Sequence, residues 1–193
     1  MTQHRISPDE AREALELVER TTRQMRRAVA HGGMPYFLII WGIVWTLGFG
    51  GTHVLGPESP GVGTLWLVLD ILGIVASVVV GWRVSVRVRS PRYNAAIGLY
   101  WLAWIVYGGL LIYFARPQSG DQLSLLVSLF AMFGYVTTGI FYRSLFLGGL
   151  GATVTVFMVV GYLLFPAVFN LWMALLGGGS LIAAGLYMRY AWR

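Results

Sequence analysis

Long runs of apolar residues, separated by short polar segments, dominate the chain from residue 34 onward. Only two residues, Arg143 and Ser144, separate the fourth run from the fifth, and so short a connection predicts an antiparallel hairpin. Over 34–193 the pattern therefore predicts an all-α integral membrane protein with six transmembrane helices arranged as three antiparallel hairpins. The six runs have roughly the 17–25 residues needed to cross a bilayer: 36–55, 65–86, 95–114, 123–142, 145–165 and 171–187.

Residues 1–33 follow a different pattern, typical of an amphipathic helix outside the membrane. Ser7 provides an N-cap, and Pro8 suits the first helical position. Glu16 and Arg20 lie one helical turn apart, at the spacing of an ion pair. We expect a cytoplasmic helix that pairs with itself or a partner, or that lies on the lipid surface. Its apolar or near-apolar stripe has heptad spacing and comprises Ala11, Leu15, Val18, Thr22, Met25 and Val29.

The distribution of arginine predicts how the chain is oriented. All 14 basic residues are arginines, and Arg116 alone lies in the loops on one side of the predicted membrane. Arginine resists transfer across a membrane, so the side with all the others is cytoplasmic. We therefore expect a multi-pass protein of a bacterial inner (plasma) membrane with both termini in the cytoplasm. The arginines expected at lipid headgroups are Arg23, Arg26, Arg27, Arg83, Arg87, Arg89 and Arg92.

Composition supports a lipid environment and limits the partners. Hydrophobic residues make up 57% of the chain and charged residues only 11%, which does not fit a solvated globular surface. The net charge of +6 is spread over helix ends at the headgroups, so we expect the bilayer as a partner and no nucleic acid. The absence of cysteine excludes disulfides and thiolate metal sites within this chain.

Asp70 is the only acid inside a predicted span, about 7–8 Å below its outer edge at 1.5 Å of rise per residue. Asp70, Gly73, Ser77 and Gly81 share one helix face, and the small residues allow a neighbouring helix to approach closely. The acid is therefore expected to point into the bundle. It either forms a proton or cation site, or is a structural acid hydrogen-bonded to other spans.

Trp104 and Tyr107 of the third span are the expected hydrogen-bond partners of Asp70 in the structural interpretation. They belong to a series of aromatic residues that either lines a ligand cavity or forms a packing seam. Together with Asp70 and Ser77, they make the candidate ligand or proton site. The series is Tyr93, Tyr100, Trp104 and Tyr107.

Glycines are concentrated in the last two spans, and two interpretations of them remain open. Close packing of helices uses small residues in this way. A flexible or broken sixth helix would use them too. The residues concerned are Gly148, Gly149, Gly151, Gly177, Gly178 and Gly179.

Catalytic and metal-binding patterns are missing from the sequence. His4 and His31 lie before the first span and His53 lies at its outer end, so the histidines are on different sides and cannot converge on a metal or haem. No paired acids or Ser–His–Asp set has a plausible meeting point. We expect no catalytic residues, no metal, no cofactor and no enzymatic activity.

Two functions therefore compete. In the first, a non-enzymatic membrane protein acts by association, as a homo-oligomer or with a membrane or cytoplasmic protein partner, through the stripe of its N-terminal helix. In the second, the chain is a small-solute or proton-coupled transporter that uses Asp70.

Overall fold

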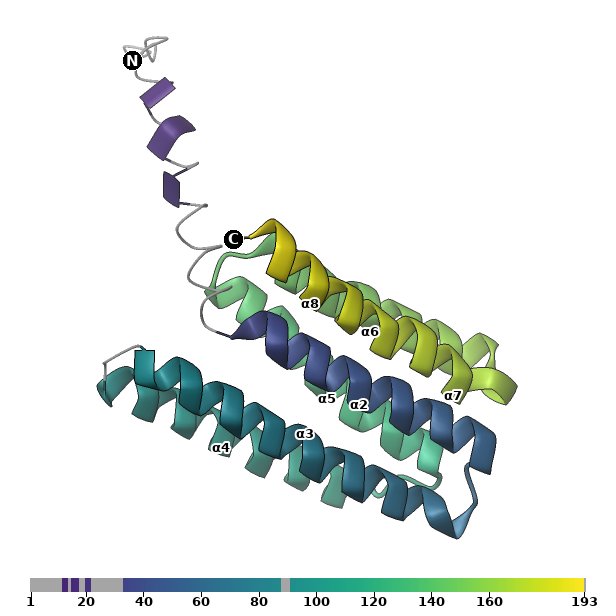
Figure 1. The fold of residues 1–193 in the computed structure, drawn as a ribbon. Helices are drawn as coiled ribbons and strands as arrows, with labels where there is room; N and C mark the ends of the chain where they lie inside the picture. Colours follow the sequence, from purple (N-terminus) through teal and green to yellow (C-terminus); the bar gives the residue numbers. More distant parts are fainter. Residues whose placement is uncertain (1–11, 14, 18–19, 22–32, 88–90, 193) are drawn as a thin grey trace, which may run out of the picture.

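The computed structural model describes most of the chain as a bundle of helices (Figure 1). The described residues are 12–13, 15–17, 20–21, 33–87 and 91–192, without the side chains of 85–87, 91–98 and 101. No strand occurs within these ranges, so the predicted all-α class is confirmed. The elements are α2 (Met34–Leu55), α3 (Pro60–Arg87), α4 (Pro91–Ala115), α5 (Gly120–Phe141), α6 (Leu145–Leu164), η1 (Pro166–Val168), α7 (Phe169–Trp172), η2 (Met173–Gly178) and α8 (Gly179–Ala191).

The helices begin where the sequence offers residues suited to a first turn. Ser119 and Ser144 cap α5 and α6. Their Oγ atoms accept hydrogen bonds from the backbone N–H of Gln122 at 3.2 Å and of Leu147 at 3.4 Å. The other starts use proline, whose missing N–H costs nothing in the first turn: Pro35 in α2, Pro60 in α3, Pro91 in α4 and Pro166 in η1.

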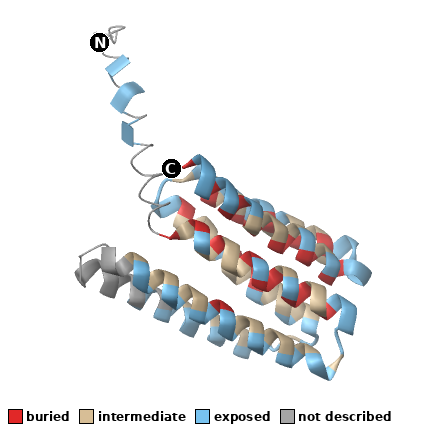
Figure 2. Cartoon of the chain, viewed as in Figure 1, coloured by how far each residue is buried: buried red, intermediate tan, exposed pale blue. Residues whose placement is uncertain are grey.

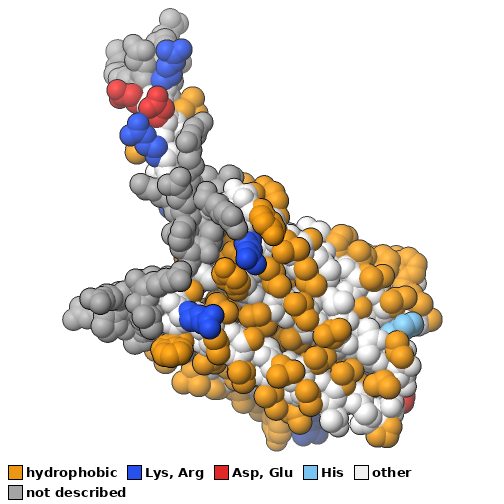
Figure 3. Space-filling model, viewed as in Figure 1, with side chains coloured by type: hydrophobic (Ala, Val, Ile, Leu, Met, Phe, Trp, Pro, Cys, Tyr) orange, Lys and Arg blue, Asp and Glu red, His pale blue; other side chains and the backbone are white. Residues whose placement is uncertain are grey.

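Among the residues that the structure describes, five helical segments are long and apolar enough to cross a membrane, and α4 contributes a shorter apolar stretch, Leu102–Ala115. Apolar side chains also cover most of the bundle face in Figure 3. These features indicate a multi-pass membrane protein. The five segments are Met34–Leu55, Pro60–Val84, Gly120–Phe141, Leu145–Leu164 and Pro166–Ala191.

Helix α2 lies at the centre of the packing, with α3 on one side and η2 and α8 on the other (Figure 1). Helix α5 packs against α6, and α4 packs against α5. Only 6% of the residues in the apolar stretch of α3 are buried inside the bundle, compared with 44% of those in the apolar stretch of Pro166–Ala191 (Figure 2). Most of the surface of α3 therefore faces the surroundings of the bundle.

Glycines bring the backbones of neighbouring helices into contact. A Cβ added to Gly42 of α2 would lie 2.9 Å from the carbonyl oxygen of Gly178, and one added to Gly185 would lie 2.7 Å from that of Pro35. Gly139 of α5 meets the backbone of Gly148 in α6 in the same way. Because any larger side chain would separate these helices, the glycines set the distance between them.

The packing interpretation of the glycines in the last two spans is confirmed for most of them. A Cβ on Gly149 or Gly179 would meet no other described atom within 4 Å, so these two positions tolerate a side chain. Contact with neighbouring side chains or backbone is made by Gly148, Gly151, Gly177 and Gly178.

The last span changes its winding at its middle. It begins as a 3-10 turn and a short α-helix, becomes a π-helix over Met173–Gly178, and returns to α-helix at Gly179. Thr46 of α2 donates a hydrogen bond to the carbonyl oxygen of Ala174 at 3.3 Å, inside this π-helix. The span is therefore widened locally rather than interrupted, and α2 supports the irregular segment.

We expect Gly178→Ala to lower the free energy of unfolding by about 1–3 kcal/mol, because the new methyl group would overlap the backbone of α2. Its Cβ would lie 2.6 Å from the backbone nitrogen of Thr46. Gly179→Ala is the matched control and should be neutral or stabilising, since alanine favours a helix. Unfolding in mild detergent, followed by circular dichroism, measures both. Equal effects of the two substitutions would contradict the close contact.

Candidate functional site

Asp70 lies on the face of α3 that packs against α2. One turn further along this face, a Cβ on Gly73 would lie 3.0 Å from Val44 Cγ2 of α2. Asp70 is half-buried, and it makes no hydrogen bond or ion pair with any residue that the structure describes. Because α3 begins at Pro60, the acid lies about 15 Å along the helix axis from its start. The helix therefore starts before the predicted span at residue 65, which lengthens the helical segment ahead of Asp70.

Ser77 follows Asp70 on the same face of α3, two turns further along. Its Oγ is buried and has no hydrogen-bond partner among the described residues. A buried hydroxyl without a partner is costly and rare, so this face carries two polar groups whose hydrogen bonds are not made within the described chain.

Trp104 and Tyr107 do not join Asp70. The Trp104 ring stacks on Phe130 of α5, with ring centroids 4.4 Å apart, and its indole lies over Gly134 of the same helix. Tyr107 is 67% exposed. The four predicted site residues are thus divided: Asp70 and Ser77 face α2, Trp104 forms a packing seam with α5, and Tyr107 points outward.

A second polar pair, which the sequence did not reveal, joins α5 to α7. Asn170 donates a hydrogen bond from Nδ2 to Asp121 Oδ1 at 3.1 Å. Asn170 is only 6% exposed, and its Oδ1 is buried with no hydrogen-bond partner in the described part of the chain. Both residues lie in predicted loops on the same side of the membrane. That placement was the only available signal, since nothing in a sequence pairs residues 49 positions apart.

Aromatic rings link four helical elements at this end of the bundle. Phe169, next to Asn170, lies 6.4 Å from Phe49 of α2 and 5.5 Å from Tyr162 of α6 between ring centroids. Phe49 in turn meets Trp66 of α3 at 4.9 Å. These edge-to-face contacts join the four elements at the end of the bundle that carries the Asp121–Asn170 pair.

Trp66 also takes part in a chain of hydrogen bonds at the same end. Its Nε1 donates to Thr52 Oγ1 at 3.0 Å, and Thr52 donates to the carbonyl oxygen of Gly48 at 2.8 Å. The polar groups of Trp66 and Thr52 thus have hydrogen-bond partners. Asp70, one turn further along α3, has none among the described residues.

The chemistry available to these groups is binding of protons, water or small cations by oxygen atoms. Carboxylates and an amide oxygen are hard ligands. Within the described ranges, no three histidine, cysteine, aspartate or glutamate residues come close enough to hold a metal ion.

The segment predicted to form the N-terminal helix is described only in part. Leu15 of the predicted stripe is 66% exposed, and the predicted ion pair between Glu16 and Arg20 is present at 3.6 Å. The other four predicted interaction residues lie outside the described residues: Val18, Thr22, Met25 and Val29.

The arginines predicted at lipid headgroups are also described only in part. Arg83, near the end of α3, is exposed. The side chains of Arg87 and Arg92 are not described. Outside the described residues lie Arg23, Arg26, Arg27 and Arg89.

Comparison with known proteins adds no assignment to this geometry. No protein-family model, curated protein or solved structure matches the chain. The interpretation of function therefore rests on the residues of the chain itself.

Proposed function

We propose that this chain is a non-enzymatic protein of a bacterial inner membrane that acts by association through its N-terminal helix. One observation carries the proposal: Leu15, a member of the heptad stripe, is 66% exposed. A helix that remained alone in water would not need an apolar stripe, so the stripe favours a second helix as its cover. A second copy of this chain is the simplest partner, because it carries a matching stripe.

The proposal includes six spans with both termini in the cytoplasm. Helix α4 has 25 residues, or about 37 Å at 1.5 Å per residue, which is enough to cross a bilayer. Arg116 follows α4 at one end of the bundle, whereas Arg83, Arg143 and Arg189 lie near the helix ends at the other. The arginine-rich end would face the cytoplasm.

We expect Leu15→Asp to weaken self-association about tenfold or more, because it removes a leucine from the interface. Leu17→Asp is a matched control: Leu17 is 67% exposed but lies outside the stripe. Sedimentation of the full chain in density-matched detergent measures the oligomer. If both variants and the unmodified chain sediment alike, whether all as monomers or all as oligomers, association through the stripe is rejected. A stripe that simply lies on the lipid surface would give that result.

The topology can be tested with single cysteines, since the chain has none of its own. We expect Gln118→Cys, between α4 and α5, to react in intact cells with a maleimide that cannot cross the membrane. Ala191→Cys, at the end of α8, should react only after the cells are opened. If α4 does not span, the pattern reverses, because every later segment then lies on the opposite side.

A transporter that uses Asp70 is the second candidate, favoured by the position of this acid deep on α3 with no partner among the described residues. An intramembrane acid of this kind is typical of proton and ion pathways. If the chain moves protons, Asp70→Asn abolishes proton flux in liposomes, while Glu58→Gln in the exposed α2–α3 loop leaves it unchanged. Flux that survives Asp70→Asn would leave association as the function.

A further inference from the structure

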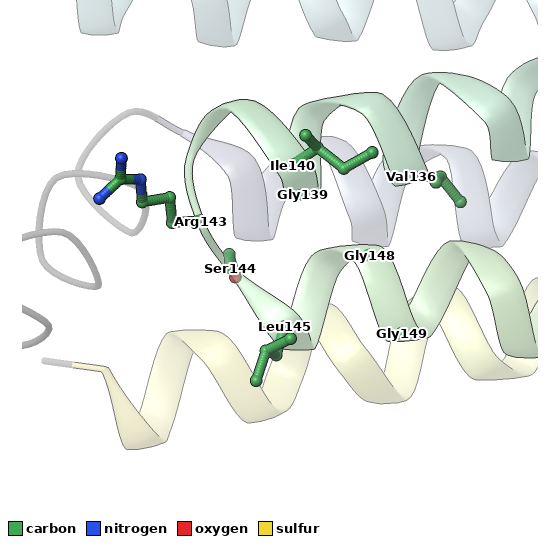
Figure 4. Close-up of a pocket in the computed structure, with 8 residues that line it drawn as sticks. All are labelled: Val136, Gly139, Ile140, Arg143, Ser144, Leu145, Gly148 and Gly149. Atoms are coloured by element: carbon green, nitrogen blue, oxygen red, sulfur yellow. The ribbon is translucent and has the colours of Figure 1, made fainter.

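The turn between α5 and α6 frames an open hollow of about 330 Å³ (Figure 4). Helix α5 forms one wall and the start of α6 the other, and the hollow opens at the end of the bundle where the arginines gather. Its lining residues are Val136, Gly139, Ile140, Arg143, Ser144, Leu145, Gly148 and Gly149.

Three of the residues that line the hollow are glycines, and three others carry aliphatic side chains. Gly139 and Gly148 bring the two backbones together, and a Cβ on Gly149 would meet no other described atom within 4 Å. Ile140 is 68% exposed and Leu145 is 95% exposed. In a membrane such a surface is open to an acyl chain, which can lie over the glycines and against the exposed aliphatic side chains.

Arg143 holds an unusual backbone conformation at the mouth of the hollow. Its φ is 47°, in the left-handed region. Its N–H donates to the carbonyl oxygen of Ile140 at 3.1 Å, and the N–H of Ser144 donates to that of Gly139 at 2.8 Å. This pair of bonds is the Schellman ending of a helix, in which glycine is the usual left-handed residue. A chain with 25 glycines uses arginine here at a conformational cost, so its side chain is expected to contribute something in return.

The guanidinium of Arg143 is available for a ligand. The side chain is exposed, and it makes no ion pair with any described residue. Figure 4 shows it extending beyond the helix ends, where the headgroups of a bilayer would lie. Ser144 Oγ accepts a hydrogen bond from Leu147 N–H, which leaves its own O–H free to donate.

We propose that this hollow binds one anionic phospholipid of the cytoplasmic leaflet. The guanidinium of Arg143 and the hydroxyl of Ser144 bind the phosphate, and one acyl chain lies along Ile140 over Gly148 and Gly149. Charge complementarity and the exposed aliphatic side chains both favour a lipid over a soluble anion. The leaflet depends on the orientation proposed above, but binding itself does not, so the two can fail separately.

The experiment is native mass spectrometry of the full chain in mild detergent, titrated with phosphatidylglycerol or with phosphatidylcholine. We expect one phosphatidylglycerol to bind preferentially, and Arg143→Gly to weaken it about fivefold, the loss expected for one surface arginine. Glycine removes the conformational cost at this position, so the variant should unfold no more easily than the unmodified chain. A thermal unfolding measurement of the same samples checks this.

Arg116→Gly is the matched control, because Arg116 also has a left-handed backbone, with φ 46°, but lies at the opposite end of the bundle. It should leave the preferred phosphatidylglycerol in place. Equal weakening by both variants, or equal binding of the two lipids, would overturn the proposal. If inorganic phosphate displaces the lipid, the site belongs to a free anion instead. If a second copy of the chain covers the hollow, the dimer binds no lipid, which would also overturn the proposal.

Discussion

The hydrocarbon interior offers no water to backbone N–H and C=O groups, and this constraint governs the whole structure. Each segment that enters the membrane must satisfy its backbone within itself, which a helix does. Lipid also provides no hydrophobic force between helices, so their association depends on close contact. The contacts of Gly42 with Gly178 and of Gly139 with Gly148 follow from this requirement, because only glycine allows two helix backbones to touch.

The same constraint gives meaning to the polar groups inside the bundle. Thr46 donates to Ala174, Trp66 donates to Thr52, and Asn170 donates to Asp121 although its own Oδ1 has no partner in the described part of the chain, so most of these polar atoms are satisfied by other helices. Asp70 and Ser77 depart from this rule in the described part of the chain. A departure of this kind is costly in lipid, and it directs attention to the α2–α3 interface as a place where a proton or ligand could act.

The bundle therefore divides into a tightly packed part and a loosely packed edge. Helices α2, α5, α6 and α8 hold most of the buried residues. In α3 and α4, most of the described side chains are exposed (Figure 2). The two proposed functions use different surfaces. Association would use the stripe that includes the exposed Leu15, and transport would use the face of α3 that carries Asp70 and packs against α2. The hollow at the α5–α6 turn, which we propose binds a phospholipid, lies on a third surface. Arg143, with its left-handed backbone, lies at its mouth after the end of α5.

The sequence by itself determined the helical class, the apolar segments and the i,i+4 ion pair of Glu16 with Arg20. These depend on local composition and spacing, which a sequence states directly. Only the tertiary structure decided which helices meet, because the spans are apolar over most of their surface and a polar face such as that of Asp70 does not name its neighbour. The pairing of Asp121 with Asn170, the π-helix over Met173–Gly178 and the separation of Trp104 from Asp70 all depend on how distant helices pack. The start of α3 at Pro60, ahead of its apolar run, has a local reason: proline suits the first turn and the residues before Leu65 continue the helix.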